Sequence, residues 1–296
     1  LYAAGQGQDL DTGEQIWSYG RGHRQFTGNH FFTSGRLKSY HQGWFYLGNS
    51  LEGTDRYVTR DYEGLRGPLM TRPKRYLLVT GITTDWRKPI SVEPEFIMNW
   101  GELMSGPGGS VSVRWNQDEH FSHQLRLGYD RTKFGAQWIF NTANDGSLPG
   151  VVGIGGVDYV FGELDQQTWD ITLRSSVLFN RDQSLQLYVQ PFLTQGDYSN
   201  PRWLATPDSY DLRPYDIQVS DFDFNYGALN LNLVYRWEYR PGSTVYLVWT
   251  HAQERYEERG EASMPNDWDN DVDFGFPLGV EPGNTFLAKV SYWFSI

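Results

Sequence analysis

The sequence predicts an all-β fold, an antiparallel transmembrane β-barrel with about 12–14 strands in this chain. Two patterns carry this prediction: apolar and polar side chains alternate over long segments, and short connections alternate with long ones. A third observation is that 16% of the residues are aromatic although the mean hydropathy is only −0.57. A barrel explains both values, because aromatic residues face lipid while the interior stays polar.

The segment 229–240 shows the alternation most clearly, since its sequence is LNLNLVYRWEYR. One face carries three leucines and three aromatic residues, Tyr235, Trp237 and Tyr239. The other face carries two asparagines and three charged residues, Arg236, Glu238 and Arg240. Twelve residues at about 3.4 Å per residue span about 40 Å, a good length for a tilted membrane strand that extends beyond the bilayer.

The same period of two recurs in four further segments, 92–100, 124–130, 168–177 and 185–191. A soluble sandwich would also have a polar face, so one strand alone decides nothing. The number of long strands, their aromatic ends and their inward charges together favour a membrane barrel. The charged residues predicted to line its lumen, as a pore or as a salt-bridged closed interior, are Glu93, Glu95, Arg126, Asp170, Arg174, Arg236, Glu238 and Arg240.

The connections between these segments alternate in length. Residues typical of tight turns occur at 87–89, 116–119, 180–183 and 240–243. Two long loops are expected at 197–222 and 257–283. Counting strands from Tyr76 puts the tight turns and the C-terminus on one side and both long loops on the other. Outer-membrane barrels have short periplasmic turns and long external loops, so we expect a bacterial outer-membrane location with a periplasmic C-terminus.

We expect 1–296 to form a single barrel domain. The segment 51–75 is charged and lacks alternation, so it is expected to be either an external loop or a plug in the lumen. The chain begins at Leu1 without an initiator Met or an apolar signal segment. We therefore expect that a signal peptide has been removed or that this is the C-terminal part of a longer protein, in which case the barrel is larger.

The last strand has an apolar face of six residues, Phe286, Ala288, Val290, Tyr292, Phe294 and Ile296. A C-terminal strand with alternating aromatic residues resembles the signal by which outer-membrane barrels are recognised for insertion, although Ile296 replaces the usual aromatic end. The alternative is an ordinary edge strand of a soluble sheet. An edge this apolar would aggregate unless it were closed into a barrel.

Composition excludes several classes of function. The chain has no cysteine, which rules out disulfides and thiol chemistry. A net charge of −11 and a pI of about 5.0 argue against nucleic-acid binding, which needs a basic face. No apolar stretch approaches the roughly 18–20 residues of a membrane helix.

Two loop clusters are candidate sites. Four carboxylates two residues apart, Asp267, Asp269, Asp271 and Asp273, could bind calcium. An EF-hand would need Gly and Glu where Val272 and Leu278 stand, so a solvated acidic loop is the favoured interpretation. An aromatic platform suited to sugars, or equally to loop packing, is formed by Tyr198, Trp203, Tyr210 and Tyr215.

Several sequence segments resemble those of a known family, among them RGPLMTRP (66–73), YVFGELDQQTWDITLR (159–174), LVYRWEYRPGSTVYLVWTHAQ (233–253) and FLAKVSYWFSI (286–296). They resemble outer-membrane proteins in which a carbohydrate-binding-module-family-9-like domain precedes a β-barrel domain of unknown function. The resemblance covers most of 66–296 and implies a barrel. It transfers no catalytic residues.

We therefore expect a non-enzymatic outer-membrane barrel, acting either as a porin-like channel or as the membrane anchor or scaffold of a cell-envelope assembly. Its expected partners are outer-membrane lipid and lipopolysaccharide, and other envelope proteins or an N-terminal domain outside this chain, but no nucleic acid. No cofactor is expected except the weakly indicated calcium. Two alternatives are a carbohydrate-binding or hydrolytic surface protein that acts through its external loops, and a soluble all-β sandwich.

Overall fold

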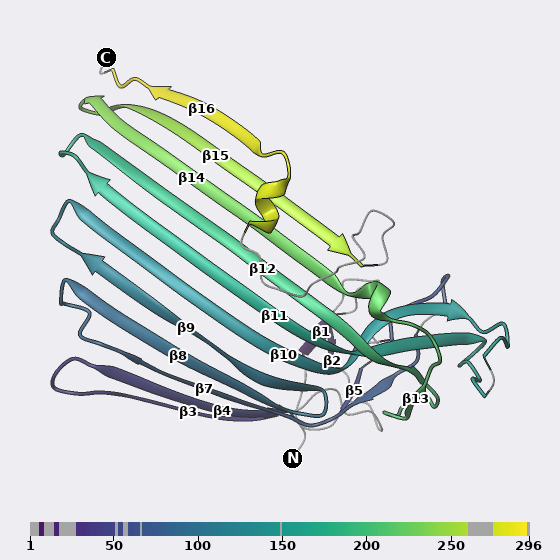
Figure 1. Ribbon diagram of the computed structural model, residues 1–296. Coiled ribbons are helices and arrows are strands. Elements are labelled where there is room, and N and C mark those ends of the chain that lie inside the picture. The colour runs from purple at the N-terminus through teal and green to yellow at the C-terminus, as the bar shows by residue number, and fades with distance from the viewer. Residues whose placement is uncertain are drawn as a thin grey trace.

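The computed structural model describes residues 6–8, 15–17, 28–50, 53–55, 59–65, 67–148, 150–259 and 275–294. Most of them form one antiparallel sheet of 12 strands (Figure 1). Its strands are β3 (Gly28–Arg36), β4 (Gln42–Ser50), β7 (Arg75–Thr83), β8 (Ile90–Gly101), β9 (Met104–Asn116), β10 (Phe121–Ala143), β11 (Val157–Leu178), β12 (Gln183–Leu204), β13 (Leu212–Pro214), β14 (Phe224–Arg240), β15 (Ser243–Glu258) and β16 (Gly283–Ser291).

The remaining elements are short. Two small sheets pair β1 (Gln6–Gln8) with β2 (Gln15–Trp17) and β5 (Gly53–Asp55) with β6 (Met70–Arg72). Two 3-10 helices, η1 (Ser220–Phe222) and η2 (Phe276–Gly279), lie in the connections before β14 and before β16. Within the described ranges, no helix has the length and apolar character needed to cross a membrane.

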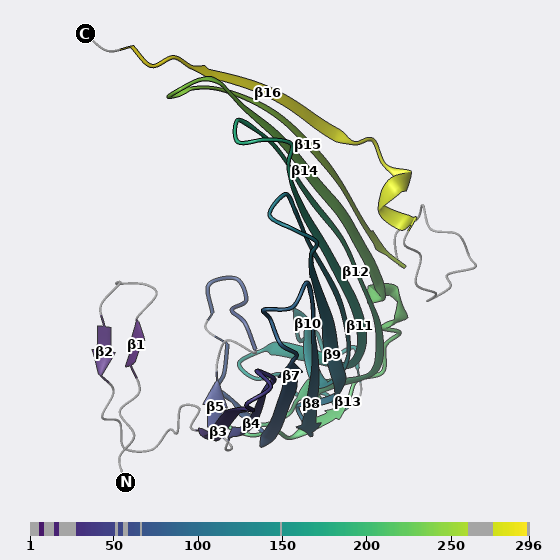
Figure 2. The same ribbon diagram turned by 90° about the vertical axis from the view of Figure 1, so that its left-hand side faces the viewer.

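The large sheet is an up-and-down meander. Eleven of its strands pair in the order β3-β4-β7-β8-β9-β10-β11-β12-β14-β15-β16, and β13 pairs only with β12. The sheet is strongly curved (Figure 2). Its edge strands β3 and β16 do not pair with each other, so these strands make an open sheet where the sequence predicts a closed barrel. The sheet has 12 strands, within the predicted 12–14, but the twelfth, β13, has only three residues and lies outside the meander.

The two ends of the sheet differ as the sequence predicts, with one exception: the two-residue connection 102–103 between β8 and β9 lies at the long-loop end. All four predicted tight turns are confirmed, and they lie at the same end as the turn 37–41 (Figure 1). The shortest is Pro241–Gly242, where Gly242 has a φ of 79°, as the third residue of a type II turn requires. The predicted loop 197–222 is shorter than expected, because β12 continues to Leu204.

Register assigns every side chain to one of two faces, since directly paired residues point to the same side of a sheet. One row of partners is Val92, Val113, Leu125, Leu173, Val189 and Leu231. The next row is Ser91, Arg114, Gln124, Arg174, Tyr188 and Asn232. We call these sides the apolar face and the polar face.

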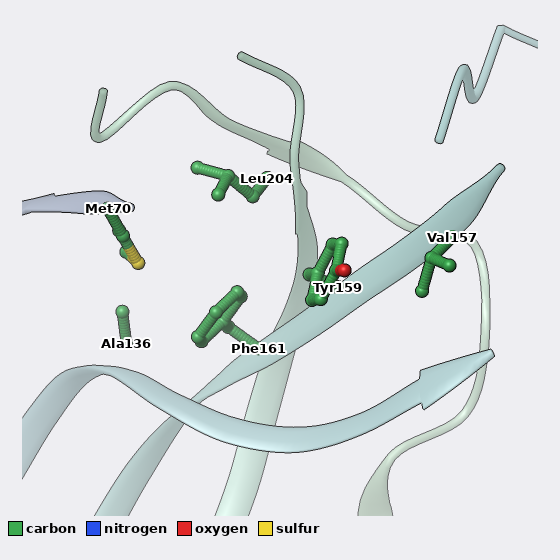
Figure 3. Close-up of a cluster of buried hydrophobic side chains, with 6 residues drawn as sticks. All are labelled: Met70, Ala136, Val157, Tyr159, Phe161 and Leu204. Atoms are coloured by element: carbon green, nitrogen blue, oxygen red, sulfur yellow. The ribbon is translucent and has the colours of Figure 1, made fainter. Parts of the chain in front are cut away.

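The buried core lies at the long-loop end, where β10, β11 and β12 extend beyond the other strands. Figure 3 shows its main cluster, which consists of Met70, Ala136, Val157, Tyr159, Phe161 and Leu204. Met70 comes from β6, and the neighbouring Thr71 donates its backbone N–H to the Ser209 carbonyl at 2.9 Å. The described part of 51–75 thus packs on the extended strand ends. We call this packed region the cap.

The cap should be stabilised chiefly by Phe161, whose side chain is fully buried. We expect Phe161→Ala to lower the free energy of unfolding of the cap by about 3–5 kcal/mol, because truncation removes apolar burial and leaves a cavity. Urea titration of the refolded protein, followed by tryptophan fluorescence, measures the loss. Val152→Ala is the control, because Val152 is 73% exposed. Equal stability of the two variants would contradict this account of the cap.

Candidate functional site

The most unusual feature of the sheet is a band of exposed apolar side chains on its apolar face. The large hydrophobic residues there that are at least one-third exposed are Phe31, Phe45, Leu47, Tyr76, Ile82, Ile90, Phe96, Trp100, Val111, Trp115, Phe121, Leu125, Leu127, Trp237, Tyr239, Leu247, Phe286 and Val290. They lie on β3, β4, β7 to β10 and β14 to β16, while the apolar residues of the same face on β11 and β12, such as Leu173 and Val189, are half-buried. Soluble monomers rarely expose an apolar patch larger than a few hundred Å². We call this surface the apolar band.

Aromatic and charged residues mark the edge of the band toward the long-loop end. On β10 and β11 the last apolar pair is Tyr129 and Trp169, whose ring centroids are 4.5 Å apart. The next residues of β10 on the same face are Arg131 and Lys133. Their cationic nitrogens lie 2.9 and 3.4 Å from an Asp165 carboxylate oxygen. Apolar surface therefore gives way to charge within two residues.

Aromatic residues also mark the edge near the tight turns. Trp237 and Tyr239 contact each other with ring centroids 6.0 Å apart. The Tyr239 hydroxyl donates to the Ser291 carbonyl at 3.2 Å, which fixes the ring against β16. The band thus has an aromatic border at both edges.

The structure bears directly on the predicted lipid-facing residues. Register puts Tyr235, Trp237, Phe286 and Val290 on the apolar face, and Tyr239, at the register shift after Glu238, contacts Trp237. Phe286 is 77% exposed, and Tyr292 and Phe294, which follow β16, are also exposed. Ile296 lies outside the described residues.

Seven of the eight predicted lumen residues share the polar face. They are Glu93, Glu95, Arg126, Asp170, Arg174, Arg236 and Glu238. Two ion pairs form within this set: Arg126 with Asp170, and Arg236 with Glu238 at 2.6 Å. Arg240 departs from the prediction, because the register shifts after Glu238 and its guanidinium instead donates to the Tyr292 hydroxyl at 2.7 Å.

A hollow of about 350 Å³ opens on the polar face between β9 and β14, nearer the tight turns. Because polar-face side chains converge on it, the polar face is the concave side of the curved sheet. Of its lining residues only Arg174 was predicted to line the lumen, and Arg114 and Asn232 are among those that the prediction missed. The signal for Arg114 was present in 110–116, where Ser110, Ser112 and Arg114 alternate with apolar residues.

The predicted aromatic platform is mostly core. Trp203 is 3% exposed and Tyr215 is 6% exposed, and both belong to a second buried cluster with Val160. Tyr210 packs against the cluster of Figure 3, and burial raises the pKa of both Tyr210 and Tyr198. These positions favour the loop-packing interpretation over a sugar platform, because a sugar cannot stack on a ring that protein atoms already cover.

The predicted calcium ligands Asp267, Asp269, Asp271 and Asp273 all lie outside the described residues. Among the residues that the structure describes, no group of three or more His, Cys, Asp or Glu side chains could hold a metal ion.

The Tyr215 hydroxyl makes a buried polar contact in the cap. It donates to the Asp158 carboxylate at 3.1 Å, and the other Asp158 oxygen accepts from the Asn144 amide at 2.7 Å. Burial, together with the Asp158 charge, raises the pKa of Tyr215 to about 12. The folded cap therefore retains a proton that an unfolded tyrosine loses near pH 10.

This shift predicts a loss of cap stability at alkaline pH. The contribution of Tyr215 is fully present below about pH 10 and falls as pH rises toward about 12, because only the unfolded state releases the proton in that window. Urea titrations at stepped pH should show wild type losing stability faster than Tyr215→Phe above pH 10. Parallel pH profiles for the two proteins would contradict the assignment.

Comparison with known proteins gives one match. Residues 19–293 match a protein family described as a domain of unknown function, DUF5916. No match was found among curated proteins. None was found among solved structures.

Proposed function

The chain belongs to the DUF5916 family, and we propose that it is an integral β-barrel protein of a bacterial outer membrane that acts as a porin-like channel. The observation that carries this proposal is the apolar band. The polar concave face, the open sheet edges and the charged border of the band support it in turn.

The height of the apolar band matches a bilayer. On β10 it extends from Phe121 to Tyr129, a rise of about 27 Å at about 3.4 Å per residue. With the strand tilt of about 40° found in barrels, this becomes about 21 Å along the membrane normal, close to the roughly 25 Å apolar belt of outer-membrane barrels. The aromatic residues at both edges match the interfacial girdles of such barrels, and Arg131 and Lys133 would lie at headgroup depth.

The edges of the sheet argue for closure. A strand edge in lipid leaves backbone N–H and C=O groups without partners, so spanning sheets close into barrels. β3 and β16 both run toward the tight turns, since each step along the path is antiparallel. Direct pairing of β3 with β16 would therefore be parallel. An all-antiparallel closure of the eleven-stranded meander needs an odd number of additional strands, which also makes the total even, as in bacterial barrels.

The polar face supports a channel rather than a filled anchor. Its ion pairs satisfy some of the inward charges, while the hollow between β9 and β14 leaves space beside them. A membrane-embedded sheet with this face inward would enclose a polar passage. We assign the tight turns to the periplasm and the cap to the exterior, because outer-membrane barrels carry short turns on the periplasmic side. Within the described part of the external loops, no residue favours the alternative of a carbohydrate-binding or hydrolytic surface protein that acts through these loops.

Two neighbouring residues of β9 test the membrane assignment. Val111 lies in the middle of the apolar band, and Ser110 faces the opposite side beside Glu95. We expect Val111→Arg to lower the free energy of folding into lipid vesicles by about 2–4 kcal/mol, the cost of arginine at the bilayer midplane. Ser110→Arg should have almost no effect, because it enters a polar interior near a carboxylate.

The measurement is urea-dependent folding of both variants into vesicles, followed by tryptophan fluorescence. Equal effects of the two substitutions would contradict a lipid-facing band. So would a folded, monomeric wild-type protein in buffer without detergent.

Conductance separates a channel from an anchor. We expect the purified chain, once inserted into planar bilayers, to give discrete conductance steps. Insertion verified by protease protection, but with no step at any applied voltage, would favour a membrane anchor or scaffold and overturn the channel proposal.

A further inference from the structure

The hollow on the polar face has the size of a small-molecule site. Its volume is about 350 Å³, near the lower end of the roughly 300–1,000 Å³ range of ligand pockets. Five strands contribute to it, from β9 to β14, and the side chains that matter below are Arg114, Gln124, Arg174, Gln186, Tyr188 and Asn232.

Strand pairing places five of these six residues in one row across the sheet. Arg114 pairs with Gln124, Gln124 with Arg174, Arg174 with Tyr188, and Tyr188 with Asn232. They therefore form one straight row across five adjacent strands. Arg114 and Arg174 are two strand spacings apart, about 10 Å between backbones. Their long side chains can both reach a ligand that lies over Gln124.

The hollow is cationic in an acidic protein. It contains two arginines and no carboxylate, although the whole chain has a net charge of −11. Among the described residues, no ion pair involves Arg114 or Arg174, whereas the neighbouring Arg126 and Arg236 each pair with a carboxylate. The Arg174 guanidinium lies 5.3 Å from the centre of the Tyr188 ring, which orients it without neutralising it.

The side-chain oxygen of Asn232 lacks a hydrogen-bond donor. Its Oδ1 atom is buried and, within the described part of the chain, accepts no hydrogen bond. Buried polar atoms nearly always have a partner, so each exception needs an explanation. Asn232 also lines the hollow, so rotation of its amide toward a bound ligand would let a ligand hydroxyl supply the missing donor.

We propose that this hollow binds a small carboxylate that also carries hydroxyl groups, the class to which sugar acids belong. The two arginines take the carboxylate, which matches the planar, two-pronged geometry of a guanidinium. Asn232, with Gln124 and Gln186, takes the hydroxyls. This binding site rests on the proposed channel function only for the route by which the ligand reaches the hollow. If the chain is a channel, sugar acids are the class of solute that it would favour.

The test is isothermal titration calorimetry on the full chain, folded in detergent at low salt, with galacturonate, galactose and acetate as probes. Galacturonate should bind saturably, and at least about 10-fold more tightly than either galactose, which lacks the charge, or acetate, which lacks the hydroxyls. Arg114→Gln and Arg174→Gln should each weaken galacturonate binding at least about 10-fold. Asn232→Leu should weaken galacturonate several-fold and leave acetate unchanged.

Arg181→Gln is the matched control, because Arg181 is exposed in the tight turn 179–182 and does not line the hollow. Circular dichroism of each variant verifies folding, and Arg174→Lys serves as a second variant if Arg174→Gln does not fold. Arg174→Lys should bind more weakly than wild type, because it keeps the charge but loses the two-pronged geometry.

Three results would overturn the proposal: no saturable binding of galacturonate by the folded wild type, binding of galactose as tight as that of galacturonate, or wild-type affinity in both arginine-to-glutamine variants. The outcome is separable from that of the membrane assignment. Chain that inserts into vesicles but binds none of the probes refutes this site alone. Chain that binds galacturonate but never enters vesicles refutes the membrane assignment alone.

Discussion

Hydrogen bonding between neighbouring antiparallel strands is the constraint on which the rest of the structure depends. Because the register is continuous from β4 to β16 except for a few bulges, each row of partners keeps its side chains on the same side of the sheet. Period-two alternation in the regular strands is thereby converted into two distinct surfaces. A slip of one residue in any pair would turn that strand's apolar side chains toward the polar face.

The apolar face and the polar face of the sheet are suited to different solvents. The apolar band has no protein covering in the described structure, and leaving its aromatic and aliphatic side chains in water would forfeit about 25 cal/mol for each Å² that could be buried. The polar face keeps its charges paired or solvated on the concave side. Among the residues that the structure describes, the main buried core lies in the cap, where β10 to β12 extend beyond the band and receive Met70 from β6. This design fits the position between lipid and water that we propose for the sheet.

Sequence patterns predict this sheet well where strands are regular. The alternation in 229–240 assigns the faces of β14 as far as Glu238, and the turn residues mark all four predicted tight turns. The prediction is wrong at Arg240, because a register shift follows Glu238 and no sequence pattern shows it.

The loop prediction at 197–222 was wrong at its start for a similar reason. The sequence Asn200–Pro201 is typical of a loop, yet β12 continues through these residues to Leu204. Asn200 has a φ of 48° within the strand. Pairing with β11 carries Trp203 into the core, so its burial depends on a long-range partner, Val160. The convergence of Arg114, Arg174 and Asn232 likewise depends on the register of five strands, which local sequence does not encode.

Cysteine scanning along β14 tests the central claim most directly, since the chain has no native cysteine. Single cysteines introduced at 229–237 would carry a fluorescent label in protein reconstituted into vesicles. Fluorescence should be quenched by lipid-borne quenchers at 229, 231, 233, 235 and 237, and by aqueous quenchers at the positions between them. Aqueous quenching at all nine positions, without alternation, would contradict a sheet with one face in lipid and the other in water.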